Sequence, residues 1–300
     1  MTRRFDLQGH RGARGLFPEN TIEGFRAALA IGVDMFELDV GLSADGIPVV
    51  HHDLGPNPAV ARGADGAWLD PPTPLLHALT RAEIARYDVG RLRPGSAYAA
   101  QFPEQRPIDG ARIPTLAAVL DVDPAVGFNL ELKTDPTRPD ATAPSIVVAE
   151  AALAVVEQGG ATGRVMFESF DWRGPRHLRR LRPDLRFAWL TDARSVADAA
   201  LWWDGPHPGD FGGSVPRAVA AEGGGVWAPA HAELTGELVA EAHDLGLSVI
   251  PWTVNQLADM RRLIAWGVDG LITDYPDRAH VVMAASGLTL PPPRLPPSDR

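Results

Sequence analysis

Residues 35–52, which read MFELDVGLSADGIPVVHH, hold two short apolar runs, Met35–Val40 and Pro48–His52. The few residues between them are too short for the crossover that joins two parallel strands. They also contain Asp45-Gly46, a strong signal for a hairpin turn. We therefore expect the second run to return antiparallel to the first.

Outside this hairpin the chain alternates short apolar runs with longer helical patterns, which is typical of parallel βα units. The candidate strands are 5–9, 35–40, 127–132, 165–170, 187–190, 225–228, 248–253 and 270–273. Candidate helices between them include 21–31, 145–158, 174–181, 236–245 and 257–266. Eight strands separated by helices predict an α/β fold, a (β/α)₈ TIM barrel with an antiparallel hairpin after its second strand.

The length of 300 residues fits one barrel domain, which we place at residues 1–287. An irregular insertion rich in Gly, Pro and Ala occupies about 53–112, and it is either a functional lid or specificity element or a surface elaboration without a role. Residues 288–300 form a proline-rich tail, expected to be disordered or wrapped on the surface.

Composition narrows the class of protein. The net charge is −10, whereas proteins that bind nucleic acids usually carry a positive charge, so we do not expect a nucleic-acid-binding protein. The chain has no cysteine, which excludes disulfides, thiolate metal sites and a cysteine nucleophile. No apolar run is long enough to predict a membrane span, and no apolar stretch precedes Gly9 as a secretory signal would, so we expect a cytoplasmic protein.

Acidic residues stand at unusual places in two candidate strands. Glu37 and Asp39 lie two residues apart, so both point to one face of an otherwise apolar strand, where they would repel each other. Glu131 and Lys133 share a face in the same way. The simplest interpretation is a bound cation, and the alternative is a buried Glu–Lys ion pair. Because Glu37, Asp39 and Glu131 offer only oxygen ligands, they suit Mg²⁺ or Ca²⁺ better than zinc.

Two histidines follow candidate strands. His10 and Arg11 end the first strand, where a TIM barrel places catalytic groups, and together offer a proton shuttle and a phosphate clamp. A two-residue hairpin turn would pair His52 with Glu37 or with Asp39, depending on its position, so we expect His52 beside a carboxylate. His51 would then point to the other face of the strand, toward solvent or toward side chains that pack there. We interpret His10 and His52 as an acid and base pair, because an imidazole can hold or release a proton at neutral pH.

Several separated motifs occur in one order: His10-Arg11, Pro18-Glu19-Asn20-Thr21, Glu37-x-Asp39, His52-Asp53, Glu131-x-Lys133 and Trp252-Thr253-Val254-Asn255, with Gly270–Pro276 near the end. Together they resemble the signature of the glycerophosphodiester phosphodiesterases over residues 5–280. The resemblance implies a TIM barrel hydrolase that uses a divalent cation to cleave a small-molecule glycerophosphodiester into glycerol 3-phosphate and an alcohol.

The resemblance also assigns roles by position. It makes Glu37, Asp39 and Glu131 the metal ligands and His10 and His52 the acid and base pair. Arg11 and Lys133 would hold the phosphate, and Phe170 and Trp252 would form apolar walls of the cleft. The chain departs from the family after His52-Asp53, where Leu54-Gly55-Pro56-Asn57-Pro58 replaces the usual Arg-Thr-Thr stretch.

Two other functions fit parts of this pattern. A sphingomyelinase D-like phosphodiesterase that cleaves phospholipid head groups shares the His, Glu-x-Asp, His order, but that group usually carries disulfides. A non-catalytic phosphodiester-binding barrel would keep the fold without the chemistry. The sequence leaves open the alcohol, the metal, the attacking group, which histidine is the acid, and the oligomeric state.

Overall fold

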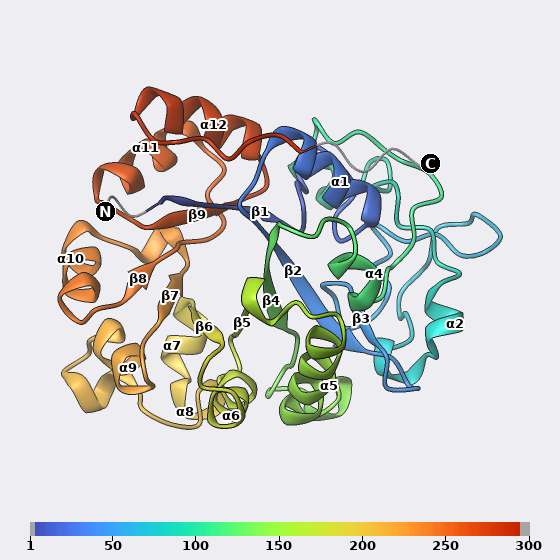
Figure 1. The fold of residues 1–300 in the computed structure, drawn as a ribbon. Helices are drawn as coiled ribbons and strands as arrows, with labels where there is room; N and C mark the ends of the chain where they lie inside the picture. Colours follow the sequence, from blue (N-terminus) through green and yellow to red (C-terminus); the bar gives the residue numbers. More distant parts are fainter. Residues whose placement is uncertain (1–3, 295–300) are drawn as a thin grey trace.

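The computed structural model describes residues 4–294 of the chain and contains a nine-stranded sheet with helices packed around it (Figure 1). The strands are β1 (Asp6–His10), β2 (Met35–Leu42), β3 (Pro48–Val50), β4 (Gly127–Leu132), β5 (Val165–Ser169), β6 (Arg186–Thr191), β7 (Val226–Pro229), β8 (Ser248–Val249) and β9 (Gly270–Thr273).

Eight of these strands run parallel in the order β9-β1-β2-β4-β5-β6-β7-β8. Backbone hydrogen bonds from Asp269 N to Val249 O (2.8 Å) and from Ile272 N to Pro251 O (3.0 Å) join the two ends of the sheet. The result is a nearly closed barrel, so the predicted (β/α)₈ TIM barrel is confirmed.

Most of the α-helices surround the barrel, and α2 and α3 belong to the insertion between β3 and β4 (Figure 1). The helices are α1 (Ile22–Ile31), α2 (Arg81–Ile84), α3 (Ala97–Gln101), α4 (Leu116–Leu120), α5 (Ser145–Gln158), α6 (Arg173–Leu181), α7 (Ala193–Ala197), α8 (Ala199–Trp202), α9 (Val215–Ala221), α10 (Gly236–Asp244), α11 (Leu257–Ala265) and α12 (Pro276–Ala285). Short 3₁₀ turns are η1 (Leu76–Ala78), η2 (Pro139–Ala141), η3 (Thr162–Arg164), η4 (Pro208–Phe211) and η5 (His231–Glu233).

Inward-facing side chains change character along the barrel axis. Over several strands they are apolar and form a cluster that includes Met35, Met166 and Ile272, with the buried Gln8 of β1 donating to Met35 Sδ (3.8 Å). Further along β2 the inward positions are Glu37 and Asp39, both buried. Because catalytic groups of this fold gather at the carboxyl ends of the strands, the change from apolar to acidic marks that end as the candidate site.

The hairpin between β2 and β3 is antiparallel as predicted, but both predicted registers are wrong. Val40 pairs with Val50, and the next hydrogen bond runs from His51 N to Asp39 O (3.0 Å). The turn has three residues instead of two, since Ser43 N donates to Ile47 O (3.1 Å). Gly46 supplies the left-handed conformation (φ 74°) that this longer turn requires. Asp39, and not Glu37, therefore lies across from His51.

Other differences concern element boundaries. The predicted strand 248–253 is regular only over β8, because Pro251 has no N–H to donate and single bonds from Ile250 N to Trp227 O (3.0 Å) and from Trp252 N to Pro229 O (3.1 Å) continue the pairing. The helices α3, α4, α7, α8, α9 and α12 were not among the predicted ones.

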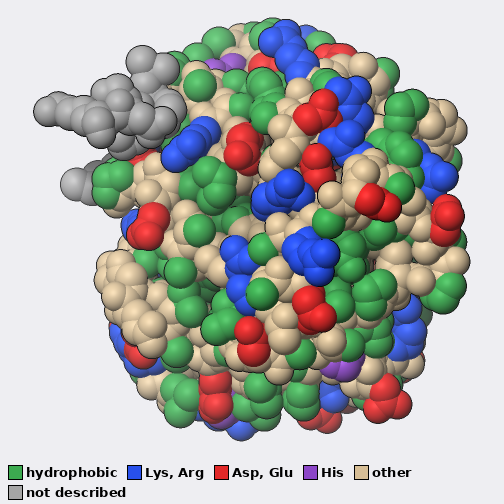
Figure 2. Space-filling model, turned by 90° about the vertical axis from the view of Figure 1, so that its right-hand side faces the viewer, with side chains coloured by type: hydrophobic (Ala, Val, Ile, Leu, Met, Phe, Trp, Pro, Cys, Tyr) green, Lys and Arg blue, Asp and Glu red, His purple; other side chains and the backbone are tan. Residues whose placement is uncertain are grey.

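The insertion between β3 and β4 has a small hydrophobic cluster of its own, which contains Val60, Leu76, Ile84 and Val89. It lies at the right of Figure 1, and Figure 2, which looks onto that side, shows basic and acidic side chains interspersed. Within the insertion, Asp109 pairs with both Arg62 (2.6 Å) and Arg91 (2.7 Å).

Two other segments are a long apolar stretch and the proline-rich tail. Among the described residues, one stretch, Pro139–Gln158, is apolar and long enough to cross a membrane by length and composition alone. In the fold it contains helix α5, one face of which is buried. The described part of the tail lies on the surface, where Arg294 pairs with Asp123 (3.0 Å). Residues 295–300 lie outside the described part.

Candidate active site

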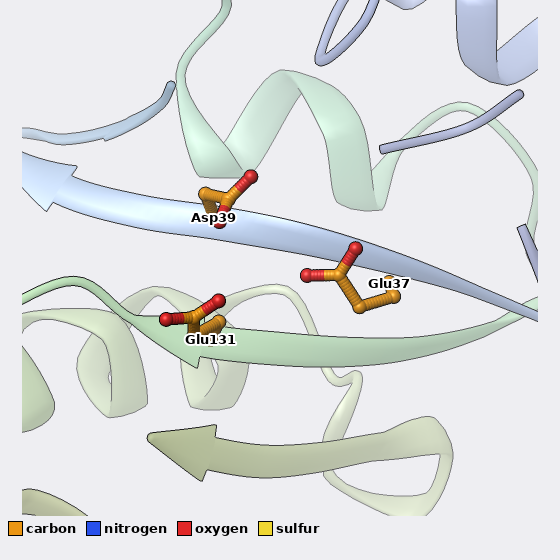
Figure 3. A group of neighbouring side chains, drawn as sticks. All are labelled: Glu37, Asp39 and Glu131. Carbon is orange, nitrogen blue, oxygen red and sulfur yellow. The ribbon is translucent and has the colours of Figure 1, made fainter. Parts of the chain in front are cut away.

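Three carboxylates meet where β2 and β4 lie side by side (Figure 3). Register pairs Asp39 with Glu131, and Glu37 shares the face of Asp39 because it lies two residues earlier on the same strand. One oxygen from each of the three lies within 4.8 Å of the others, and all three residues are buried. The structure thus brings together the three residues predicted to bind a metal.

Electrostatics in this group are unfavourable without a cation. Burial, together with repulsion from Asp39, raises the pKa of Glu37 well above its usual range, and burial also raises the pKa of Glu131. Burial opposes ionisation of Asp39 too, but Arg11, His52 and Lys133 outweigh it and hold the Asp39 pKa well below normal. The protein therefore holds several acids where they resist being charged together.

The donor set fits a hard divalent cation. All three candidate ligands are carboxylates, the oxygen type that Mg²⁺ and Ca²⁺ prefer. Oδ1 of Asp39 is buried and accepts no hydrogen bond from residues 4–294, although Lys133 Nζ lies 3.5 Å away. A carboxylate oxygen left free in this position can serve as a metal ligand.

Two basic side chains, those of Lys133 and Arg11, contact the carboxylate group. Lys133 Nζ contacts Glu131 Oε1 (2.8 Å), so the Glu–Lys ion pair considered as an alternative is present beside the carboxylate group. Arg11 Nε lies 3.2 Å from Asp39 Oδ2, and Arg11 Nη1 donates to Glu19 Oε1 (2.9 Å). Lys133 lines the open cleft, whereas Arg11 is buried among its acidic partners.

His10 is held by a carboxylate that the sequence analysis did not single out. Its Nδ1 lies 2.6 Å from Oδ1 of Asp274, and its Nε2 lies 3.5 Å from Glu37 Oε2. Arg14 binds both oxygens of Asp274 (2.9 and 3.0 Å), and His10 and Arg14 hold the Asp274 pKa far below normal against the effect of burial. Asp274 is therefore ionised and accepts a hydrogen bond from the Nδ1–H of His10, which leaves the lone pair of the imidazole on Nε2.

Burial lowers the pKa of His10 to about 4, with Arg14 and Arg11 adding to the effect while Asp274 opposes it. At neutral pH the imidazole is thus a free base whose Nε2 is directed toward the carboxylate group. This is the form that can accept a proton from a nucleophile.

Replacing Asp274 with asparagine is expected to lower kcat about 10²- to 10⁴-fold, since an amide can donate to Nδ1 and favour the wrong tautomer of His10. Steady-state kinetics would measure the loss, and ¹⁵N chemical shifts of the imidazole would report the tautomer. A variant with an unchanged kcat would show that Asp274 does not orient His10.

His52 follows the hairpin and has a similar partner. Its Nδ1 lies 2.8 Å from Asp53 Oδ1, and Asn57 donates to the other oxygen of Asp53 (2.6 Å). Burial, with Arg11 and Lys133, lowers the pKa of His52 to about 4. The His52 side chain keeps 33% of its area exposed, against 9% for His10, so His52 faces the open cleft and His10 lies deeper.

A cleft of about 730 Å³ opens beside His52, Glu131 and Lys133. The aromatic residues Phe170 and Trp252 line it, with ring centroids 5.4 Å apart. Residues 54, 55, 57 and 58, where the chain departs from the family pattern, also line the cleft, as do Trp202 and Arg194.

Sequence reasoning missed further polar residues. Glu168 on β5 pairs in register with Glu131, and burial raises its pKa to about 8. Asn20 donates to Asp39 Oδ2 (2.8 Å). An acid at an inward position of a third strand was a signal that could have identified Glu168, by the same alternation that identified Glu37 and Asp39.

A family model described as the glycerophosphoryl diester phosphodiesterase family matches residues 10–278. The chain belongs to this family. A glycerophosphodiester phosphodiesterase of Bacillus subtilis is 30% identical over 280 residues, which cover 91% of this chain and 84% of the relative. A probable glycerophosphodiester phosphodiesterase of Mycobacterium tuberculosis is 28% identical over 93% of this chain and 90% of its own.

Solved structures agree with membership of the glycerophosphoryl diester phosphodiesterase family. A crystal structure from Silicibacter pomeroyi DSS-3, provisionally named a glycerophosphoryl diester phosphodiesterase, superimposes with a TM-score of 0.86 at 39% identity and covers 96% of both chains. An Oleispira antarctica phosphodiesterase solved with sn-glycerol-3-phosphate shares the fold, with a TM-score of 0.70 at 22% identity over 93% of this chain and 96% of its own. The recognition from sequence motifs is confirmed.

Proposed function

We propose that this phosphodiesterase hydrolyses glycerophosphodiesters to glycerol 3-phosphate and an alcohol, with a divalent cation and a His10–His52 acid and base pair. The observation that carries the proposal is the carboxylate group Glu37, Asp39 and Glu131. A histidine backed by its own carboxylate contacts this group, and a second lies beside it at the cleft.

The charges favour an anionic substrate only when a cation is present. Glu37, Asp39 and Glu131, when ionised, outnumber Arg11 and Lys133. A divalent cation bound by the three carboxylates supplies the positive charge that stabilises a phosphodiester oxygen. Lys133, which lines the cleft, and Arg11, which also holds Asp39 ionised, are the two residues that hold the phosphate.

The two histidines move the protons. One Nε2 accepts the proton of the attacking water, and the other histidine gives a proton to the alkoxide as its bond to phosphorus breaks. If the neighbouring glycerol hydroxyl attacks instead, the same two transfers give a cyclic phosphate, and a water molecule then opens it to glycerol 3-phosphate. The negative phosphodiester raises the pKa of the imidazole beside it, so the acid carries its proton in the complex. Asp274 and Asp53 keep each ring oriented throughout.

The aromatic walls suit a glycerol moiety. Phe170 and Trp252 offer apolar surface for its carbon atoms next to Lys133 and Glu131. The structure of the Oleispira antarctica phosphodiesterase with sn-glycerol-3-phosphate supports this choice of product.

Hydrolysis of a panel of glycerophosphodiesters with choline, ethanolamine, glycerol and inositol as the alcohol tests the proposal. We expect release of glycerol 3-phosphate from at least one of them with added Mg²⁺ or Ca²⁺, and loss of the reaction in EDTA. Sphingomyelin and lysophospholipid are tested as substrates in the same assay, because the alternative function is cleavage of phospholipid head groups. Activity on these two lipids alone, or failure on every substrate, would contradict the proposal.

A further inference from the structure

One segment of the insertion reaches the residues around Arg11. The hydroxyl of Tyr98, on helix α3, donates to Oε2 of Glu19. Oε1 of the same carboxylate accepts from Arg11 Nη1 (2.9 Å). Arg11 in turn lies 3.2 Å from Oδ2 of Asp39. A continuous chain of charged hydrogen bonds and ion pairs thus links the insertion to a candidate metal ligand.

The loop between β1 and α1, which carries Arg11, has a conformation that depends on such support. Arg11 (φ 51°) and Asn20 (φ 53°) both adopt the left-handed region without being glycine, and Asn20 N donates to Arg11 O (3.0 Å). Left-handed backbone at such residues costs free energy and persists only where surrounding contacts hold it. Glu19, which lies beside Asn20, is one of these contacts.

The same segment of the insertion packs further along this loop. Gln105 Nε2 donates to Arg14 O (2.7 Å), and Arg106 N donates to Leu16 O (2.8 Å). The guanidinium of Arg14 lies 4.6 Å from the ring centroid of Phe102, which also contacts Tyr98 (5.3 Å between centroids). Residues 98–106 therefore support one side of the loop that carries Arg11 and Arg14.

We propose that Tyr98 is a positioning residue that acts through Glu19 to hold Arg11 in place for the phosphate-binding site. The inference rests on the proposed function for the phosphate role of Arg11. In this role the insertion is neither a lid over the site nor a surface segment without function. It stabilises the conformation of the β1–α1 loop by packing against one side of it.

Replacing Tyr98 with phenylalanine tests this inference, because the change removes one hydroxyl and keeps the ring against Phe102. A hydrogen bond to a carboxylate is worth enough for about a tenfold effect. We expect about a tenfold rise in KM for the glycerophosphodiester and in Kd for inorganic phosphate, with a smaller change in kcat. The matched control is Tyr87→Phe, since Tyr87 packs on the insertion's own cluster and both constants should stay unchanged.

A second variant separates positioning from general stability. In a Glu19→Gln background, Tyr98→Phe should change KM and phosphate affinity less than about twofold, because its effect passes through that carboxylate. A lower melting temperature with unchanged KM and Kd would overturn the inference, as would full additivity of the two substitutions. Wild-type protein that binds phosphate but cleaves no glycerophosphodiester would defeat the proposed function, and the phosphate Kd would still decide the role of Tyr98.

Discussion

The His10→Gln variant is expected to lose about 10²- to 10⁴-fold in kcat, the usual contribution of a positioned acid or base. Glutamine fills similar space but cannot accept a proton, and in the wild type the Nε2 of His10 is the free-base nitrogen because Nδ1 faces Asp274 (2.6 Å). Steady-state hydrolysis measures the loss. The control is His177→Ala, whose imidazole pairs with Glu150 on the helices outside the barrel. Near-normal turnover of His10→Gln would remove His10 from the acid and base pair.

The same variant should change how stability depends on pH. Burial lowers the pKa of His10 from 6.5 to about 4, so between these values the unfolded chain binds more protons at this residue than the folded chain. The contribution of His10 therefore makes the folded protein less stable as the pH falls from 6.5 to 4. Relative to His10→Gln, the wild type should lose up to about 1.4 kcal/mol per pH unit over this window. Denaturant unfolding at several pH values checks the sign, and a constant difference would contradict it.

Asp39→Asn should abolish cation-dependent catalysis. Asp39 is a carboxylate held in its ionised form, and its Oδ1 is free of hydrogen bonds from residues 4–294, so an amide at this position removes both the charge and a ligand oxygen. A divalent cation bound by these carboxylates would supply several kcal/mol of transition-state stabilisation, so the proposal predicts a loss of about 10³-fold or more.

Cation binding can be measured separately from catalysis, through its effect on the stability of the folded protein. At a cation concentration about 100 times its Kd, the wild type should gain about 2.7 kcal/mol of stability, and Asp39→Asn should gain little. Asp184→Asn is the control, because Asp184 is an exposed acid paired with Arg182 (2.7 Å) away from the cleft. Wild-type protein that is fully active in chelator and gains no stability from Mg²⁺ or Ca²⁺ would exclude a metal at these residues.

Local patterns were enough to predict much of this molecule. Period-two alternation placed Glu37 and Asp39 on one face, and the order of strands and helices predicted the barrel that brings Glu131 next to them. The hairpin was predicted, but its register was wrong because the turn has three residues. Turn length depends on the conformation of Gly46, and an Asp-Gly pair is compatible with more than one length.

Two of the residues that were missed, Asp274 and Tyr98, contact partners that are far away in the sequence. Asp274 reaches His10 because β9 pairs with β1, where Gly9 lies opposite Thr273. Tyr98 reaches Glu19 because the insertion folds back over the β1–α1 loop. Neither contact follows from spacing within a motif. The pairing of the first and last barrel strands was implied by the predicted fold, and it could have pointed to Asp274.

The contact between His10 and Asp274 spans 264 positions and joins the first barrel strand to the last. During synthesis the candidate metal ligands and both histidines leave the ribosome long before Asp274 emerges. Until β9 takes its place beside β1, His10 lacks the carboxylate that orients it. Completion of the active centre therefore coincides with closure of the barrel, and the appearance of hydrolytic activity during refolding would time the last step of assembly.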